Sequence, residues 1–187
     1  MNTIAFIGLD HDEVGALDIA IEKAKEKGLE VIPGVELSAT CCDYDVHILG
    51  YFVDYQNPRL LDFLDYLKEE RVHRVHRILG KLNKAGVKIS FEKVAEQAGN
   101  GCIGRPHIAE VMVREGLVTT FQSAFNYYLA EGKPAFERKV KISPAEAIKT
   151  LHLAGGIATL AHPGQNLSEQ VILEVIQSGV DAIETVH

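Results

Sequence analysis

The sequence predicts an α/β fold with a mostly parallel sheet and an inserted helical subdomain. Three observations lead to this fold class. A strand pattern, a helix pattern and further strands follow one another near the N-terminus, several helices then follow without strands, and the alternation returns afterwards. Such alternation is typical of βα units. We therefore expect a first domain made of residues 1–55 and 134–187, with a helical insertion over residues 56–133.

The N-terminal portion predicts three strands and one helix. The apolar run TIAFIGL predicts a buried strand, and DEVGALDIAIEKAKEKG predicts a helix, because Val14 and Leu17 begin a series of apolar residues at helical spacing. LEVIPGVELSA and DVHILGYFV predict two further strands, the first interrupted at Pro33-Gly34.

The middle of the chain predicts helices only. The first runs from Pro58 to about Ala85, and the second, SFEKVAEQAG, has Ser90 in position to cap it. The segments GRPHIAEVMVREG and TTFQSAFNYYLAEG predict two more.

The strand and helix alternation resumes with SPAEAIKTLHLAGG, a helix with Ser143 as its N-cap and Pro144 in its first turn. IATLAHPG predicts a strand that ends in His162, SEQVILEVIQSG a helix, and VDAIETVH a last strand.

Composition excludes several classes of protein. The 187 residues carry a net charge of −7, which argues against an extended nucleic-acid surface or an anionic membrane surface as partner. Three cysteines, two of them adjacent and none in a CxxC pair, predict neither a disulfide framework nor a thiolate zinc site. Because no apolar run is long enough to span a membrane and no signal peptide is recognisable, we expect a cytoplasmic protein.

Metal-capable side chains gather where the predicted strands end. In parallel α/β folds the carboxyl ends of strands carry the functional groups. A carboxylate within an apolar strand is costly to bury unless it is paired or bound to metal, and imidazole with carboxylate suits Zn, Mn or Fe. The residues concerned are Asp10, His11, Asp12, Glu36, His47 and His162.

A second candidate site lies in NGCIGRPHIAE. Pro106 suits a first helical turn, so Arg105 and His107 are expected near a helix N-terminus, where backbone N–H groups favour anions. Arginine can add a bidentate contact to phosphate. A plain helix start with a solvent-facing arginine is the alternative interpretation.

The motifs DHDEVGA, VIPGVELSA, DVHILGYF, GRPHIA and GGIATLAHPG, in this order, resemble the PHP (polymerase and histidinol phosphatase) family. The most similar branch contains the TrpH-like metal-dependent phosphoesterases and the nucleoside bisphosphate phosphatases. The resemblance implies a distorted (β/α)7 barrel, here incomplete, with two or three divalent ions, Mn, Fe or Zn, in the complete family site. It also implies hydrolysis of a phosphate ester by metal-activated water, with no side chain as nucleophile.

By position, the resemblance makes His11, Glu36, His47 and His162 the metal ligands. Asp10 would hydrogen-bond or orient a ligand, and Asp12 would cap the following helix or contact the metal. Arg105 and His107 would hold substrate phosphate. The implied substrate is a small phosphorylated metabolite, such as a nucleoside 3′,5′-bisphosphate or a short oligonucleotide.

The sequence departs from the family pattern at both ends. The HxH motif of the first family strand and the DxH motif of the last have no match, and we assign no role to His187. Two expectations follow. The chain is a truncated form of an ordinary phosphoesterase, or it is a non-catalytic homologue that binds a phosphorylated ligand, a metal or a partner chain. Exposed strands at the open barrel edges would favour self-association.

Overall fold

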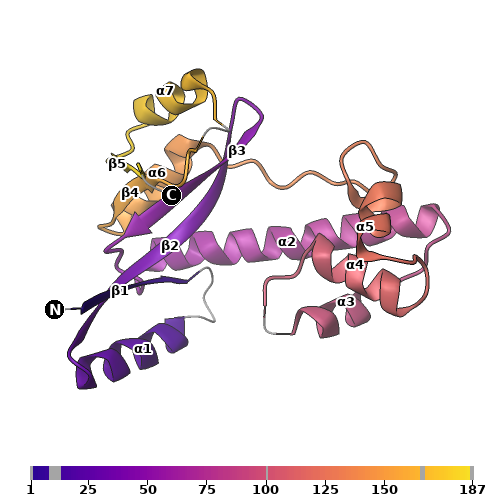
Figure 1. Cartoon of the computed structure of the whole chain (residues 1–187), viewed down its shortest axis with the longest axis horizontal. Coiled ribbons are helices and arrows are strands. Elements are labelled where there is room, and N and C mark those ends of the chain that lie inside the picture. The colour runs from indigo at the N-terminus through magenta and orange to yellow at the C-terminus, as the bar shows by residue number, and fades with distance from the viewer. Residues whose placement is uncertain (1, 9–13, 100, 165–166, 186–187) are drawn as a thin grey trace. The chain divides into compact units, whose positions relative to one another are not determined.

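A computed structural model describes residues 2–8, 14–99, 101–164 and 167–185 of the chain (Figure 1). The elements in chain order are β1 (Asn2–Gly8), α1 (Val14–Glu26), β2 (Leu29–Cys41), β3 (Tyr44–Tyr51), α2 (Pro58–Lys84), α3 (Phe91–Ala98), α4 (Arg105–Arg114), α5 (Phe121–Ala124), the π-helical turn η2 (Phe125–Leu129), α6 (Pro144–Leu153), β4 (Ile157–Leu160), α7 (Glu169–Gln177) and β5 (Ala182–Ile183). In the part of the chain that is described, no helix has the length and apolar character needed to cross a bilayer.

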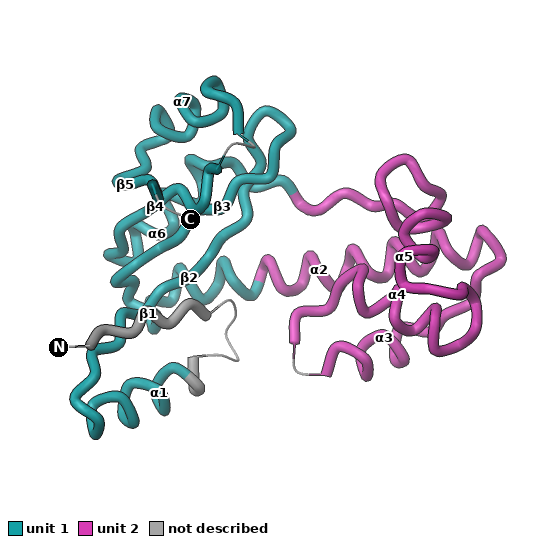
Figure 2. Tube along the Cα trace, in the orientation of Figure 1, with its two compact units in different colours: residues 1–65, 141–187 teal, residues 66–140 magenta. Residues whose placement is uncertain are grey.

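The chain divides into two compact units (Figure 2). Unit 1 comprises residues 1–65 and 141–187, and unit 2 comprises residues 66–140. The sheet belongs to unit 1, and unit 2 is helical. The first boundary falls inside α2, so this one helix contributes residues to both units.

The sheet is mixed, and the prediction of a mostly parallel sheet is wrong. Its strand order is β1-β2-β3-β4-β5. The pairs β1/β2 and β4/β5 are parallel, whereas β2/β3 and β3/β4 are antiparallel. The cause lies in the turn between β2 and β3. Only Cys42 and Asp43 connect the two strands, both with positive φ (49° and 65°), and a two-residue connection can join antiparallel strands only.

One face of the β2/β3 hairpin forms the core of unit 1. Leu37 and Ile48 are fully buried there and lie opposite each other across the hairpin. Helix α6 packs against both strands, and a Cβ added at Gly50 would lie 2.3 Å from Leu151 Cδ2. A side chain at residue 50 would therefore force Leu151 to shift. Because side chains alternate along a strand, the residues between the core positions point to the other face.

Helix ends in unit 1 follow the sequence signals. The Ser143 hydroxyl accepts a hydrogen bond from the backbone N–H of Glu146 at 3.2 Å, which confirms the predicted N-cap of α6. Strand β2 continues through Pro33, so the predicted interruption is wrong.

Unit 2 has its own apolar core, formed by the C-terminal part of α2 with α3, α4, α5 and η2. Its fully buried members, each at most 1% exposed, include Val75, Ile78, Leu82, Val94, Ile108, Met112 and Leu129. The helix predicted over TTFQSAFNYYLAEG starts as α5 and continues as a π-helical turn, a difference that matters for Arg105 below. Ser90 occupies the N-cap of α3 but its side chain makes no capping hydrogen bond.

Candidate metal centre and anion site

Two of the candidate metal ligands lie inside the β2/β3 hairpin. Glu36 pairs with Leu49 in the ladder, and His47 pairs with Ser38, so Glu36 and His47 are diagonal neighbours on one face. This face is opposite the one that α6 covers. Glu36 lies within β2 and His47 within β3, so the expectation that both residues sit at strand ends is wrong. Strand β3 is the second arm of a hairpin and not a parallel strand.

His162 approaches the same face from β4. The ladder between β3 and β4 continues past the end of β4, since the backbone N–H of Ala161 donates to the carbonyl oxygen of His47 at 2.9 Å. The chain then turns at His162, which has a φ of 29°. Strand β4 thus ends at Leu160, before the predicted end at His162, and His162 lies just beyond its carboxyl end.

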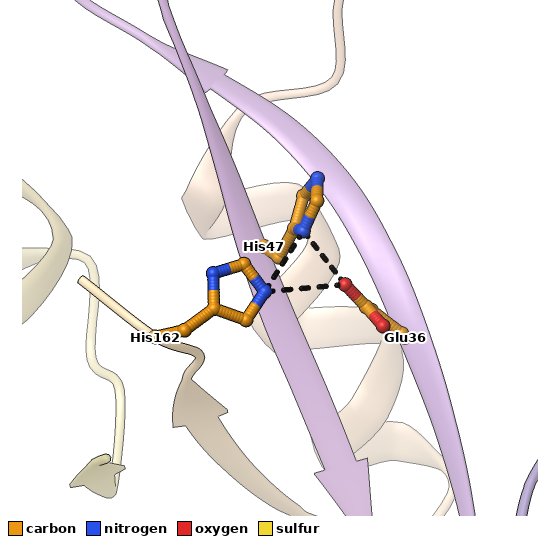
Figure 3. A group of neighbouring side chains, drawn as sticks. All are labelled: Glu36, His47 and His162. Atoms are coloured by element: carbon orange, nitrogen blue, oxygen red, sulfur yellow. Dashed lines mark hydrogen bonds and ion pairs between the residues drawn. The ribbon is translucent and has the colours of Figure 1, made fainter. Parts of the chain in front are cut away.

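The three side chains converge (Figure 3). Glu36 Oε1 lies 2.7 Å from His47 Nδ1 and 3.7 Å from His162 Nε2, and the two nitrogens are 3.2 Å apart. The imidazole rings are perpendicular, with their centroids 5.0 Å apart. Each side chain is about one-third exposed, at 32%, 33% and 40% respectively, so solvent and ions can reach the group.

The donor set fits a divalent ion. One atom from each of Glu36, His47 and His162 lies within 4.8 Å of the other two. Nitrogen and oxygen ligands about 2.0–2.1 Å from a tetrahedral ion are separated by ~3.3 Å, which is close to the spacings found. Two imidazoles with one carboxylate is a donor set that zinc and other first-row metals accept. Hydrogen bonds between Glu36 and His47 at 2.7 Å and between His47 and His162 at 3.2 Å are the alternative interpretation of the same geometry.

The remaining metal-related predictions fall on Asp10, His11 and Asp12, which lie outside the described residues, as does His187. These assignments stay predictions. Gly8, the last residue of β1, is paired with Val35, the neighbour of Glu36.

Glu184 is a site residue that the sequence interpretation missed. Its Oε2 accepts a hydrogen bond from the backbone N–H of His162 at 2.6 Å. The pKa of the Tyr51 phenol is raised by burial, then by the negative charges of Glu184 and Glu36, which places these groups in one neighbourhood. The signal that marked Glu36, a carboxylate within an apolar strand pattern, is also present in VDAIETVH.

Unit 2 contains Arg105 and His107, both in the first turn of α4 as predicted. His107 closes that turn itself, because its Nδ1 accepts the N–H of Gly104 at 3.2 Å. The imidazole thereby stabilises the helix start, and its other nitrogen points away from this bond.

Arg105 is held from several sides. Its Nη1 donates to the carbonyl oxygen of Leu129 at 3.1 Å, and its Cζ lies 5.8 Å and 5.7 Å from the ring centroids of Phe125 and Phe136. The π-helical turn supplies both the Phe125 ring and the Leu129 carbonyl. Such turns are often found at functional sites.

Positive charge is concentrated around Arg105. The pKa of Arg74 is lowered to about 10, first by burial and then by the charges of Arg105 and Arg71. Arg74 donates its Nε and Nη2 to the carbonyl oxygen of Glu137, at 3.0 Å and 2.8 Å. Positive charges that lie close enough to lower the pKa of Arg74 also attract an anion.

Comparison with known proteins identifies relatives of this chain. No protein-family model matches the chain. The chain is 38% identical over 154 residues to a 5′-3′ exoribonuclease of Haemophilus influenzae, an alignment covering 82% of this chain and 56% of that protein. It is 32% identical over 181 residues to a 3′,5′-nucleoside bisphosphate phosphatase of Chromobacterium violaceum, covering 94% of this chain and 64% of that protein.

The fold is also shared with a solved structure. A Bifidobacterium adolescentis protein, provisionally assigned as a metal-dependent phosphoesterase, superimposes with a TM-score of 0.77 and 28% identity over 98% of this chain and 66% of that chain. The chain is a homologue of these proteins, which confirms the resemblance to the PHP family predicted from its motifs. It spans little more than half the length of the exoribonuclease it matches.

Proposed function

We propose that the protein is a metal-dependent phosphoesterase that hydrolyses a phosphate ester of a nucleotide or a short RNA. The observation that carries this proposal is the convergence of Glu36, His47 and His162 on one point of the sheet. The names of the relatives, an exoribonuclease and a bisphosphate phosphatase, support a substrate that contains phosphate and a nucleoside.

In this proposal Glu36, His47 and His162 hold the metal, and His11 completes the set from the segment that follows Gly8. Asp10 hydrogen-bonds or orients a ligand, and Asp12 caps the following helix or contacts the metal. Bound divalent metal polarises a phosphoryl oxygen and makes bound water a nucleophile near neutral pH. The proposed ions are Mn, Fe or Zn, two or three in a complete site, and the proposed fold is part of a distorted (β/α)7 barrel.

The residues of unit 2 bind the substrate in this proposal. Arg105 offers phosphate the guanidinium N–H groups that do not donate to Leu129, and the neighbouring positive charges strengthen its attraction for anions. His107 keeps the first turn of α4 closed, so the helix N-terminus stays ordered beside the phosphate. Neither side chain acts as a nucleophile.

The test combines metal binding with phosphate release. The purified chain is titrated with Mn²⁺ and then assayed for Mn²⁺-dependent release of phosphate or nucleotide from nucleoside 3′,5′-bisphosphates and short 5′-phosphorylated RNAs. We expect Mn²⁺ binding, with release from at least one substrate, and loss of both in Glu36→Gln.

The control variant is His73→Ala, which removes an exposed histidine of α2 paired only with Glu70 at 3.3 Å among the described contacts. It should behave like the unchanged chain. Binding of Mn²⁺ without any hydrolysis would favour the non-catalytic alternative, a module that binds metal and a phosphorylated ligand. Absence of Mn²⁺ binding would contradict the proposal itself.

A further inference from the structure

The chain between β4 and α7 leaves the sheet in a strained conformation. His162 has a φ of 29°, a left-handed region that non-glycine residues rarely adopt and that costs of order 1–3 kcal/mol. Such a conformation persists only where neighbouring groups hold it. His162 is also one of the three residues that form the candidate metal centre.

Glu184 supplies the holding contact. The parallel pairing of β4 with β5 continues one step beyond the strand, since the backbone N–H of Glu184 donates to the carbonyl oxygen of Leu160 at 3.0 Å. This bond fixes the backbone of Glu184 beside Leu160, which lies two residues before His162 in the chain. From there, its side chain accepts the N–H of His162 at 2.6 Å, a short, charge-assisted hydrogen bond.

A backbone contact just before His162 places the start of the turn. The bond from Ala161 to His47 aligns β4 with β3 up to the residue before the turn. One residue further along, the N–H of His162 donates to Glu184. Fixing this N–H sets the direction of the Cα–Cβ bond, and with it the direction of the imidazole towards Glu36.

We propose that Glu184 is a positioning residue, which uses its hydrogen bond to the His162 backbone to aim that imidazole at the shared point between Glu36 and His47. This inference rests on the proposed metal-binding function. Glu184 acts through His162 and needs only an acceptor oxygen. A role as a direct ligand would need its negative charge and would not depend on His162.

Two substitutions separate these roles. Glu184→Gln keeps an acceptor oxygen without the charge, and Glu184→Ala removes the acceptor. We expect Glu184→Ala to weaken Mn²⁺ binding roughly 10- to 100-fold, as loss of partners that orient metal ligands does, and Glu184→Gln to stay within about threefold of the unchanged chain. Titration calorimetry measures both, and thermal unfolding shows that each variant is folded.

A measurement without metal tests the hydrogen bond itself. In the NMR spectrum the His162 amide proton should lie downfield and exchange slowly, and this signature should vanish in Glu184→Ala but persist in Glu184→Gln. Thr185→Ala, next to Glu184 and solvent-exposed, is the matched control and should change neither readout.

A double-mutant cycle with His162→Ala completes the test. In that background Glu184→Ala should have no further effect on Mn²⁺ affinity, because its target is gone. The inference is overturned if Glu184→Gln loses as much affinity as Glu184→Ala, if Glu184→Ala binds Mn²⁺ normally, or if the His162 amide is unchanged. An unchanged chain that binds no Mn²⁺ contradicts the proposed function instead, whatever the amide shows.

Discussion

The two candidate sites are built in different ways. In unit 1, Glu36, His47 and His162 come from three strand segments, and the register of the sheet brings their atoms together. In unit 2, Arg105 is surrounded by local helical structure, with the π-helical turn holding its guanidinium group. The first site therefore depends on long-range pairing of the backbone, whereas the second depends mainly on side-chain packing around one helix start.

This difference means that single substitutions should affect the two sites independently. Glu36→Ala removes the oxygen that both imidazoles approach, so Mn²⁺ affinity should fall by at least about 100-fold, more than loss of an orienting partner costs. Arg105→Ala should leave Mn²⁺ affinity unchanged and raise the KM for a phosphorylated substrate. Calorimetry with Mn²⁺ and steady-state kinetics check both. If Arg105→Ala abolished Mn²⁺ binding, the two sites would not be separable.

The two units should also differ in how well they tolerate an added methyl group, and substitution of one glycine in each unit tests this. At Gly50→Ala the new Cβ meets Leu151 Cδ2 at 2.3 Å and Val53 Cγ1 at 3.1 Å, and such overpacking costs typically about 1–3 kcal/mol. Gly80→Ala, inside α2 in unit 2, meets nothing within 4 Å and should stabilise the helix by roughly 0.5–1 kcal/mol. Urea unfolding of the two variants should shift in opposite directions.

The aromatic contact in unit 2 predicts a smaller effect. Phe125→Ala removes one of the two rings beside the Arg105 guanidinium, and cation–π contacts contribute about 0.5–1 kcal/mol at exposed sites and more when desolvated. We expect the affinity for inorganic phosphate to fall severalfold with Mn²⁺ binding unchanged. Tyr127→Ala is the control, because this residue of the same π-helical turn is 66% exposed. Equal losses in both variants would argue for general disruption of the turn.

The smallest effect is expected from an ion pair in unit 1. The pKa of Asp181 is held below its ordinary value, first by a hydrogen bond from His152 at 2.7 Å and then by the N–H of Ala158. A lowered folded-state pKa stabilises the fold above the unfolded-state pKa of about 3.9, and this contribution is lost as pH falls through the folded-state pKa.

Asp181→Asn should therefore reduce the free energy of unfolding at pH 7 by less than about 1 kcal/mol, since both side chains are over 40% exposed. The difference from the unchanged chain should shrink below about pH 4. Chemical unfolding at several pH values measures it, and a difference independent of pH would exclude this ion pair as its cause.

Local signals predicted the helices well. The helical periodicity from Pro58 and the Ser143-Pro144 start gave α2 and α6 close to their bounds. The sequence does not indicate the antiparallel pairing of β2 with β3. Its turn residues, Cys42 and Asp43, are not typical of a hairpin turn with two positive φ angles. The chemistry of Glu36 and His47 identifies them as candidate metal ligands. Their position side by side on one face of the sheet follows only from the hairpin register.

Other features depend on contacts that no local pattern encodes. His47 and His162 are 115 residues apart in the chain. The role of Glu184 requires the pairing of β5 with β4 and the turn at His162 together. The surroundings of Arg105 require the π-helical turn, which the sequence pattern does not distinguish from an ordinary helix.

The place of unit 2 in the chain has a consequence for how the candidate metal centre forms. Glu36 and His47 belong to one hairpin with a two-residue turn, so their meeting requires only a local folding event. Residues 66–140 lie in the chain between β3 and β4, so bringing His162 to this hairpin closes a loop that contains all of unit 2. The entropy of closing such a loop grows only with the logarithm of its length, about 0.6 kcal/mol for each doubling. The inserted unit could therefore lengthen or shorten considerably during evolution while the three ligands still assemble at little extra cost.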